Sequence, residues 1–96
     1  MKEKIYLSGG ISGRLLEEVK REFLNKEIEL EENGYEVLNP FRNGLDANAP
    51  YFEHMLKDIE MLFQADAIYM LRDWNLSDGA RVEHFIANTY KKKVFL

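Results

Sequence analysis

Short apolar segments alternate with helix-like segments along the whole chain, and this alternation limits the possible folds more than any other feature. Strands are predicted over residues 4–8, 35–38, 67–71 and 93–96, and helices over about 14–32, 51–63 and 79–90. The resulting order, βαβαβαβ, is typical of a parallel sheet with right-handed crossovers and helices on both faces. We therefore predict an α/β fold: a small doubly wound, Rossmann- or flavodoxin-like sheet of four parallel strands.

The composition excludes several classes of protein. The 96 residues are enough for one small domain, residues 1–96, and 46% hydrophobic with 31% charged residues describes an ordinary globular chain. The net charge of −4 argues against a nucleic-acid polymer as partner, since phosphate backbones bind concentrated basic faces. The sequence has no cysteine for disulfides or thiolate metal sites. It also has neither an apolar run of membrane-spanning length nor a signal peptide, so we expect a cytoplasmic protein.

A parallel sheet brings the ends of its strands together at one edge, where such folds bind ligands. The loop 8–14 follows the first predicted strand, Asn39 and Phe41 follow the second, and Ser77 precedes the helix that carries Glu83 after the third. The helix that contains Asp58 begins at the same edge. We therefore expect these residues to surround one crevice.

The loop after the first strand reads Ser8-Gly9-Gly10-Ile11-Ser12-Gly13-Arg14. Backbone N–H groups at a strand-to-helix junction suit a phosphate group, and an arginine can pair with it. The loop is not a Walker loop, because no Gly-Lys-Ser/Thr follows. The alternative is a tight turn that needs the backbone freedom of glycine.

Asp58 and Glu83 form a candidate carboxylate pair. Two carboxyl groups on either side of a glycosidic bond divide the work, one as nucleophile and the other as proton donor. A hydrogen bond from Tyr6 would fix the orientation of Glu83. The alternatives are that both acids are solvated helix residues and that Tyr6 is a core or edge aromatic.

Other polar and aromatic residues carry weaker predictions. Trp74, in the loop after the third strand, either stacks on a base or packs against its own loop. Asp66 precedes the third strand at the opposite edge, so we interpret it as structural. His54 and His84 lack partners at metal-ligand spacing, and we predict no metal and no cofactor.

Four segments in this order resemble the nucleoside 2-deoxyribosyltransferase superfamily, in particular its 2′-deoxynucleoside 5′-phosphate N-hydrolases and short bacterial and phage members. They are residues 5–13 (Ile-Tyr-Leu-Ser-Gly-Gly-Ile-Ser-Gly), residues 34–40 (Gly-Tyr-Glu-Val-Leu-Asn-Pro), Asp58 followed by Asp66, and Ser77-x-Gly79-x-x-x-Glu83-x-x-x-Ala87. The resemblance covers nearly the whole chain, and its strength lies in the order and spacing of the segments.

The resemblance implies specific roles. Glu83 matches the family's nucleophilic glutamate, Asp58 its helix aspartate near base and sugar, and Tyr6 the tyrosine that orients the glutamate. Ser77 stands where the nucleotide hydrolases use a serine on the 5′-phosphate. Gly10 and Ser12 stand where those enzymes use Ser and Arg, and Arg14 is a candidate for the displaced charge.

The implied function is cleavage of the N-glycosidic bond of 2′-deoxynucleosides or their 5′-monophosphates, by hydrolysis or base exchange, in a homodimer or higher homo-oligomer. The implied substrate site consists of Ser8, Gly9, Gly10, Ile11, Ser12, Arg14, Asn39, Phe41, Trp74, Ser77 and Gly79. The alternative is a module of the same fold that binds a nucleotide-like ligand without turnover. Phe85, where relatives often have Gly, and the end of the chain after the fourth strand favour this alternative.

Overall fold

Four parallel strands form the centre of the structure, a computed structural model that describes residues 2–11 and 13–96. Along the chain the elements are β1 (Lys4–Ser8), α1 (Leu16–Glu32), β2 (Glu36–Leu38), η1 (Pro40–Arg42), α2 (Tyr51–Gln64), β3 (Ala67–Met70), η2 (Trp74–Leu76), α3 (Asp78–Thr89) and β4 (Lys93–Phe95). η1 and η2 are single 3-10 turns. The strand order is β2-β1-β3-β4 and every pairing is parallel, which confirms the predicted doubly wound α/β fold.

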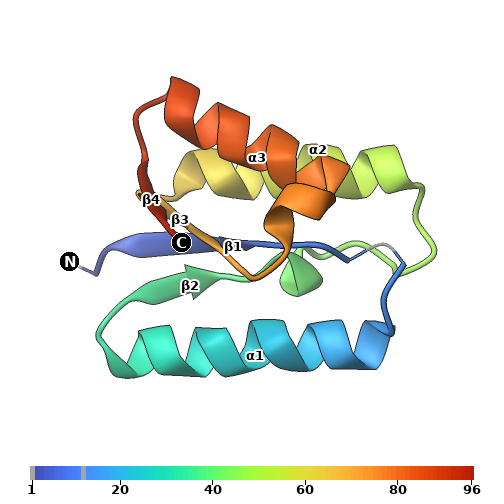
Figure 1. Ribbon diagram of the computed structural model, residues 1–96, viewed down its shortest axis with the longest axis horizontal. Helices are drawn as coiled ribbons and strands as arrows, with labels where there is room; N and C mark the ends of the chain where they lie inside the picture. Colours follow the sequence, from blue (N-terminus) through green and yellow to red (C-terminus); the bar gives the residue numbers. More distant parts are fainter. Residues whose placement is uncertain (1, 12) are drawn as a thin grey trace.

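The helices cover the sheet unequally. Helix α1 lies on one face, and α2 and α3 lie together on the other (Figure 1). Each face has its own core: Val19 and Phe23 of α1 pack with Ile5 and Leu7, whereas Leu62 of α2 packs on the opposite face.

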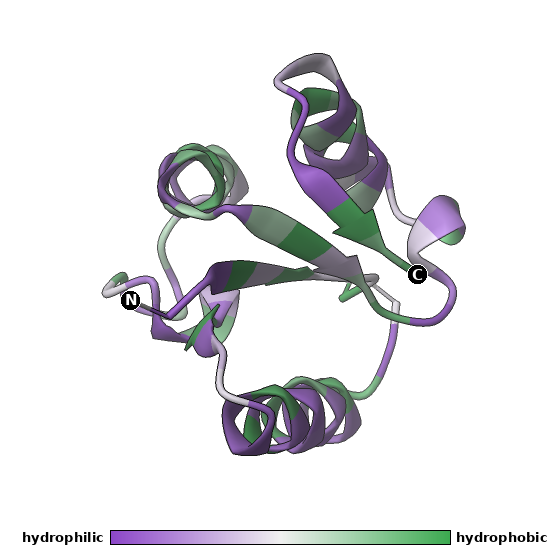
Figure 2. Cartoon of the chain, turned by 90° about the vertical axis from the view of Figure 1, so that its left-hand side faces the viewer, coloured by the Kyte–Doolittle hydropathy of each residue, from purple (hydrophilic) through white to green (hydrophobic). Residues whose placement is uncertain are grey.

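The alternation of side chains along β1 separates these two cores. Ile5 and Leu7 belong to the core beneath α1, and Tyr6 belongs to the core beneath α2 and α3. All three side chains are fully buried because β1 is paired on both sides. The same alternation directs Ser8 to the face of Tyr6. Figure 2 shows the hydrophobic colour concentrated on the central strands, while the helices are mixed.

The chain changes direction across the sheet at β1. The first crossover leads from β1 to β2 on one side, and the next leads to β3 on the other, with Ser8 of β1 in register with Met70 of β3. Such a switch point leaves a crevice at the carboxyl ends of the two strands, because the following loops diverge. Tyr6, Ser8 and Glu83 meet on the α2–α3 side of this point, whereas Ile11, Asn39 and Phe41 lie on the α1 side of the sheet.

Element ends differ from the predictions by one or two residues. α1 begins at Leu16 rather than near Arg14, and β2 begins at Glu36 rather than Tyr35. The second difference arises because Tyr35 N–H donates to the Leu30 carbonyl and so completes the end of α1. Gly34 makes this turn possible with a φ of 93°. None of the helices in residues 2–11 and 13–96 combines the length and the hydrophobicity that crossing a bilayer requires; the cytoplasmic location stays a prediction.

Candidate active site

Glu83 lies on the inner side of α3, facing the sheet. Its neighbours on that side are Ala80 and Ala87, whose small side chains let the helix approach the strands, and Glu83 itself is only 6% exposed. Ser77 begins the helix as its N-cap, with its Oγ accepting the N–H of Ala80 at 3.2 Å. The possibility that Glu83 is a solvated helix residue is therefore wrong.

Two hydroxyl groups of β1 hold the Glu83 carboxylate. The Tyr6 hydroxyl donates to Oε2 at 2.9 Å, and Ser8 Oγ donates to Oε1 at 2.6 Å, both in buried surroundings. The hydrogen bond expected from Tyr6 is thus present. Ser8, expected in the substrate cradle, instead contacts the carboxylate directly. Because each carboxylate oxygen receives its own donor, the rotation of the group is fixed.

The electrostatic environment of Glu83 lacks a compensating cation. The pKa of Glu83 is raised to about 7, chiefly by burial; the hydrogen bonds from Ser8 and Tyr6 oppose this rise, and the nearby Asp58 carboxyl adds to it. Salt bridges among the described residues include none to Glu83. Burial and the neighbouring carboxyl groups also raise the pKa of Tyr6 well above its ordinary value, so its hydroxyl remains a donor at neutral pH.

Asp58 lies on the side of α2 that faces the sheet and is half-buried. Burial raises its pKa, while a hydrogen bond from Asn43 and the nearby His54 lower it. Asn43 Nδ2 donates to Asp58 Oδ1 at 3.0 Å. The Asp58 carboxyl contributes to the raised pKa of both Glu83 and Tyr6, so its charge acts on the same pair of groups.

Glycines border this site where chain segments approach closely. A Cβ on Gly79 would lie 2.9 Å from the Tyr51 hydroxyl, so a side chain there would displace the exposed Tyr51 ring. A Cβ on Gly9 would lie 3.1 Å from Leu71 Cβ, which joins the first loop tightly to the end of β3. Gly10 lies against Ser77. Ser12, predicted in the same cradle, lies outside the described residues.

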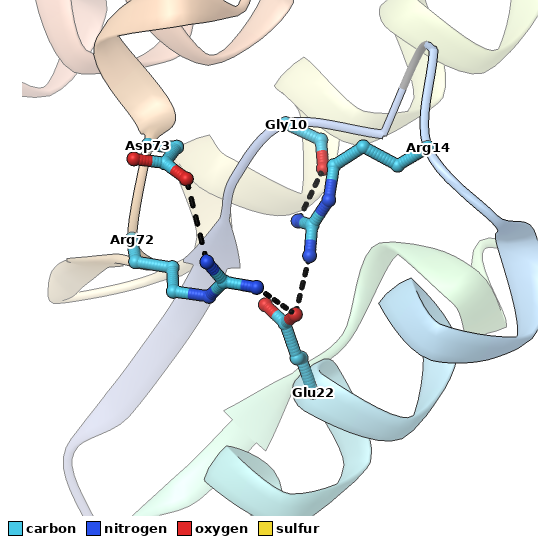
Figure 3. A network of polar contacts seen from close by, with 5 residues as sticks. All are labelled: Gly10, Arg14, Glu22, Arg72 and Asp73. Atoms are coloured by element: carbon cyan, nitrogen blue, oxygen red, sulfur yellow. Dashed lines mark hydrogen bonds and ion pairs between the residues drawn. The ribbon is translucent and has the colours of Figure 1, made fainter.

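Arg14 points away from the site and towards α1. Its guanidinium donates to the Gly10 carbonyl at 3.2 Å and forms an ion pair with Glu22, which also binds Arg72 at 3.0 Å (Figure 3). Arg72 in turn reaches Asp73 at 3.5 Å. In this arrangement Arg14 ties the glycine loop to the loop after β3, and its charge is already shared with Glu22.

Three other predicted substrate residues lie on the α1 side of the sheet. Ile11 and Phe41 pack against the core beneath α1, where Phe41 meets the ring of Phe23 at 5.1 Å between centroids. Asn39 is 5% exposed; its Oδ1 accepts the Phe41 N–H, and its Nδ2 donates to Glu27 at 2.9 Å. The structure therefore does not bring these residues together with Glu83.

The predictions for Trp74, Asp66, Phe85 and a metal site have different outcomes. Trp74 stacks on His84 of α3 with 4.3 Å between ring centroids, so its ring packs on the helix rather than on its own loop. Asp66 accepts the Lys4 N–H at 2.9 Å, and its structural role is confirmed. Phe85 is 69% exposed on the outer side of α3 and does not crowd Glu83. Within residues 2–11 and 13–96, no group of three or more His, Asp or Glu side chains is arranged to hold a metal ion.

A cavity of about 660 Å³ lies elsewhere. It opens between α1 and the end of β3, with Glu22, Lys26, Tyr69, Arg72 and Leu96 in its walls. The walls do not include Tyr6, Asp58 or Glu83. Glu83 itself is 6% exposed, whereas Asp58 is half-buried.

Two further residues belong to the site: Asn43 was not singled out from the sequence, and His54 was considered there only as a metal ligand. Asn43 and His54 both contact the Asp58 side of the site, and Asn43 is 7% exposed. Asn-Gly dipeptides are typical of turns, and Gly44 has a φ of 86° here. A turn signal does not reveal that the asparagine amide points inward to an aspartate 15 residues later.

Comparisons with known proteins give a family without an assigned activity. A search of curated proteins gives no significant match. A family model described as "Domain of unknown function (DUF4406)" matches residues 3–96. This match spans every strand and helix of the fold, together with Tyr6, Asp58 and Glu83. The chain therefore belongs to the DUF4406 family.

Proposed function

We propose that this protein cleaves the N-glycosidic bond of 2′-deoxynucleosides or their 5′-monophosphates, with Glu83 as the nucleophile. The observation that carries the proposal is the environment of Glu83. It is a buried carboxylate without a cation, oriented by Tyr6 and Ser8 and beside a second carboxyl group at the switch point of the sheet. The resemblance of the ordered motifs to nucleoside 2-deoxyribosyltransferases supports the same chemistry.

The reaction proceeds in two displacements. A carboxylate oxygen of Glu83 attacks C1′ as the bond from C1′ to the base nitrogen breaks, and protonated Asp58 gives its proton to the departing base. Water then attacks C1′ of the glycosyl-enzyme, Asp58 takes a proton from it, and Glu83 leaves as a carboxylate. A second base in place of water gives base exchange.

The division of roles follows from the donors around each carboxyl group. Glu83 receives hydrogen bonds on both oxygens, which stabilise its ionised form and the negative charge it regains when the intermediate breaks down. The reactive form has Glu83 ionised and the proton on Asp58. Because the two groups interact, the pH profile reports the pair rather than either residue.

The 5′ end of the substrate is expected between the glycine loop and the start of α3. Gly10 lies against Ser77 there, and Ser77 retains its hydroxyl proton as a donor while its oxygen caps the helix. Arg14 contributes indirectly, by holding the Gly10 carbonyl.

Release of free base tests the proposal. Deoxynucleosides, ribonucleosides and their 5′-monophosphates are incubated with the protein, with and without an acceptor base, and the products are separated by chromatography. We expect release that falls about 10³-fold or more in Glu83→Ala. Glu32→Gln, at an exposed position of α1, is the matched control. No release from any substrate by the folded wild-type protein contradicts the proposal.

The second candidate is a module that binds a nucleotide-like ligand without turnover. The low exposure of Glu83, 6%, favours it, because the nucleophile is not open to a sugar in this structure. Calorimetry separates the two candidates. Binding of a deoxynucleoside monophosphate without release of base, and with the same affinity in Glu83→Gln, supports the binding module.

We also infer that copies of the chain associate through the apolar surface of α2 and α3. The exposed side chains are Phe52 (61%), Leu56 (64%), Phe63 (47%), Phe85 (69%) and Tyr90 (61%). Phe63 and Tyr90 meet at 5.0 Å between centroids, which joins the two helices into one surface. At these exposures the surface amounts to roughly 600 Å², close to one side of a standard interface.

The charges at the border of this surface suit a second copy. Glu53 and Glu60 of α2 are acidic, whereas Arg81 of α3 and the adjacent Lys91 are basic, and Glu60 and Arg81 already pair with Lys57 and Asp78 of their own helices. A two-fold arrangement that sets α2 of one copy against α3 of the other is therefore favoured. Light scattering after size-exclusion chromatography is expected to show a dimer that Leu56→Glu dissociates. Leu76→Glu, at an 80% exposed position outside this surface, is the control. A wild-type monomer at high concentration contradicts the inference.

A further inference from the structure

The loop between η1 and α2 carries Asn43, whose buried side-chain amide donates a hydrogen bond to Asp58. Asn43 is 7% exposed, and its Nδ2 lies 3.0 Å from Asp58 Oδ1 and 3.0 Å from His54 Nδ1. Its Oδ1 accepts the N–H of Leu45 at 3.0 Å. This last bond sets the orientation of the amide, because only the oxygen can accept from a backbone N–H. Both hydrogens of Nδ2 are then directed at Asp58 and His54.

His54 completes the arrangement as an acceptor. Its Nε2 lies 3.1 Å from the carbonyl oxygen of Asp46, which can only accept, so Nε2 carries the ring hydrogen. Nδ1 is therefore free of hydrogen in the neutral ring and accepts from Asn43. The amide has no unused hydrogen, and rotation of Asn43 would break contacts with both α2 and Leu45.

The position of Asn43 is fixed independently of Asp58. Its backbone N–H donates to the Pro40 carbonyl at 3.2 Å. The segment just before Asn43 is anchored to α1, because the side chains of Asn39 and Arg42 both bind the buried carboxylate of Glu27. The amide is thus presented to Asp58 by a loop tied to the opposite face of the sheet, an arrangement suited to holding a reactive side chain in one rotamer.

We propose that Asn43 is a positioning residue that makes Asp58 Oδ1 the accepting oxygen and leaves Oδ2 as the oxygen that carries the proton for the leaving base. The assignment of that proton rests on the proposed function, whereas the orientation of Asp58 by Asn43 does not. Among the described residues, hydrogen bonds to the Asp58 side chain reach only Oδ1. The titratable groups that face Asp58 are Glu83 on α3, Tyr6 on β1 and His54 on its own helix.

The first experiment needs only folded protein. The ¹³C carboxyl signal of Asp58 is titrated by NMR in the wild type, in Asn43→Leu, and in Asn48→Leu, an exposed asparagine of the same loop. Loss of the donor is expected to raise the pKa of Asp58 by about one unit in Asn43→Leu. The control is expected to leave it unchanged. An unchanged Asp58 pKa in folded Asn43→Leu overturns the proposal.

A wild-type measurement keeps the proposal testable if Asn43→Leu does not fold. The side-chain NH₂ signals of Asn43 should shift with pH at the same midpoint as the Asp58 carboxyl signal, because the hydrogen bond strengthens as the carboxyl ionises. Asn43 signals that do not respond to the Asp58 titration overturn the proposal.

The second experiment asks where the proton goes. The substrates are 2′-deoxyguanosine 5′-monophosphate and its N7-methyl form, whose base already carries positive charge and departs without a proton. We expect Asn43→Leu to lose roughly 10- to 100-fold in kcat on the first substrate and less than about threefold on the second. Equal losses on both substrates overturn the positioning role. A wild type that releases no base from either substrate contradicts the proposed function and leaves the NMR result on orientation standing.

Discussion

Two buried glutamates, on opposite faces of the same sheet, have different hydrogen-bond and charge partners. Glu27, on α1, is 7% exposed and binds the Arg42 guanidinium together with the Asn39 amide. Glu83, on α3, is 6% exposed; from the described residues 2–11 and 13–96 its carboxylate receives two hydroxyl groups and no cation, with a second carboxyl group close by. A buried carboxylate paired with a cation holds a loop in place. A buried carboxylate without a cation makes the folded protein less stable when it is ionised, and a reaction that neutralises the charge relieves this cost.

The penalty at Glu83 predicts an unusual dependence of stability on pH. Its folded pKa of about 7 lies above the ordinary value of 4.5, so the folded state binds more protons than the unfolded state between these values. Stability is therefore lost as the pH rises from about 4 to 8, by up to about 3 kcal/mol from this group. Glu83→Gln is expected to remove this loss and to be more stable than wild type at pH 8.

Urea unfolding of both proteins at pH 5 and pH 8 measures this difference. The exposed Glu32→Gln variant should follow the wild type at both values. A free energy of unfolding for Glu83→Gln that falls below the wild type by the same amount at both pH values would show that Glu83 is only a structural acceptor.

Glu27 should behave in the opposite way. Glu27→Leu leaves the buried Asn39 amide without its acceptor and Arg42 without its anion, and we expect a loss of about 2 kcal/mol. The estimate stays below that of a fully buried pair because Arg42 is 59% exposed. Chemical denaturation gives the loss, with Glu31→Leu at an exposed position of α1 as control. An unchanged free energy of unfolding in Glu27→Leu would contradict this structural role.

Removing either hydroxyl group that binds Glu83, that of Tyr6 or that of Ser8, is expected to have a smaller effect. Tyr6→Phe and Ser8→Ala each remove one donor to Glu83, with about 1 kcal/mol less stabilisation of the ionised carboxylate. Because these bonds lower the pKa of Glu83, each substitution is expected to raise it further, which moves the acidic limb of the activity profile to higher pH. Tyr90→Phe, at an exposed position, should leave the profile unchanged. A shift towards lower pH would contradict the role of the hydroxyl groups.

The Arg14–Glu22–Arg72 network should matter least for stability. All three side chains are partly or largely exposed, and such pairs contribute little against solvent and salt. Glu22→Gln is expected to change the free energy of unfolding by less than about 0.5 kcal/mol. Its effect on the KM for a 5′-monophosphate, compared with the same substrate without phosphate, is the informative measurement, because Arg14 also holds Gly10. A loss of several kcal/mol would show that the glycine loop is needed for folding.

The sequence by itself determined the order of the elements and placed their ends to within one or two residues. Asn33-Gly34 ends α1, and Ser77 caps α3, because these residues satisfy the helix ends locally. Ala80 and Ala87 on either side of Glu83 also share its helix face, a pattern that favours a buried position. Local chemistry and the repeat of side chains along a strand or helix are short-range properties, so a single sequence contains them.

Only the tertiary structure decided which polar groups meet. Glu83 finds its donors 77 and 75 residues earlier, at Tyr6 and Ser8, and no local pattern indicates that Ser8 serves the carboxylate. Phe41 follows β2 at the expected edge, yet its ring packs beneath α1. The inward amide of Asn43 and the engagement of Arg14 by Glu22 also depend on how separate elements pack. Hydrogen bonds and burial at a site are set by packing across the sheet, because the direction of each loop side chain follows from its partners rather than from its position in the chain.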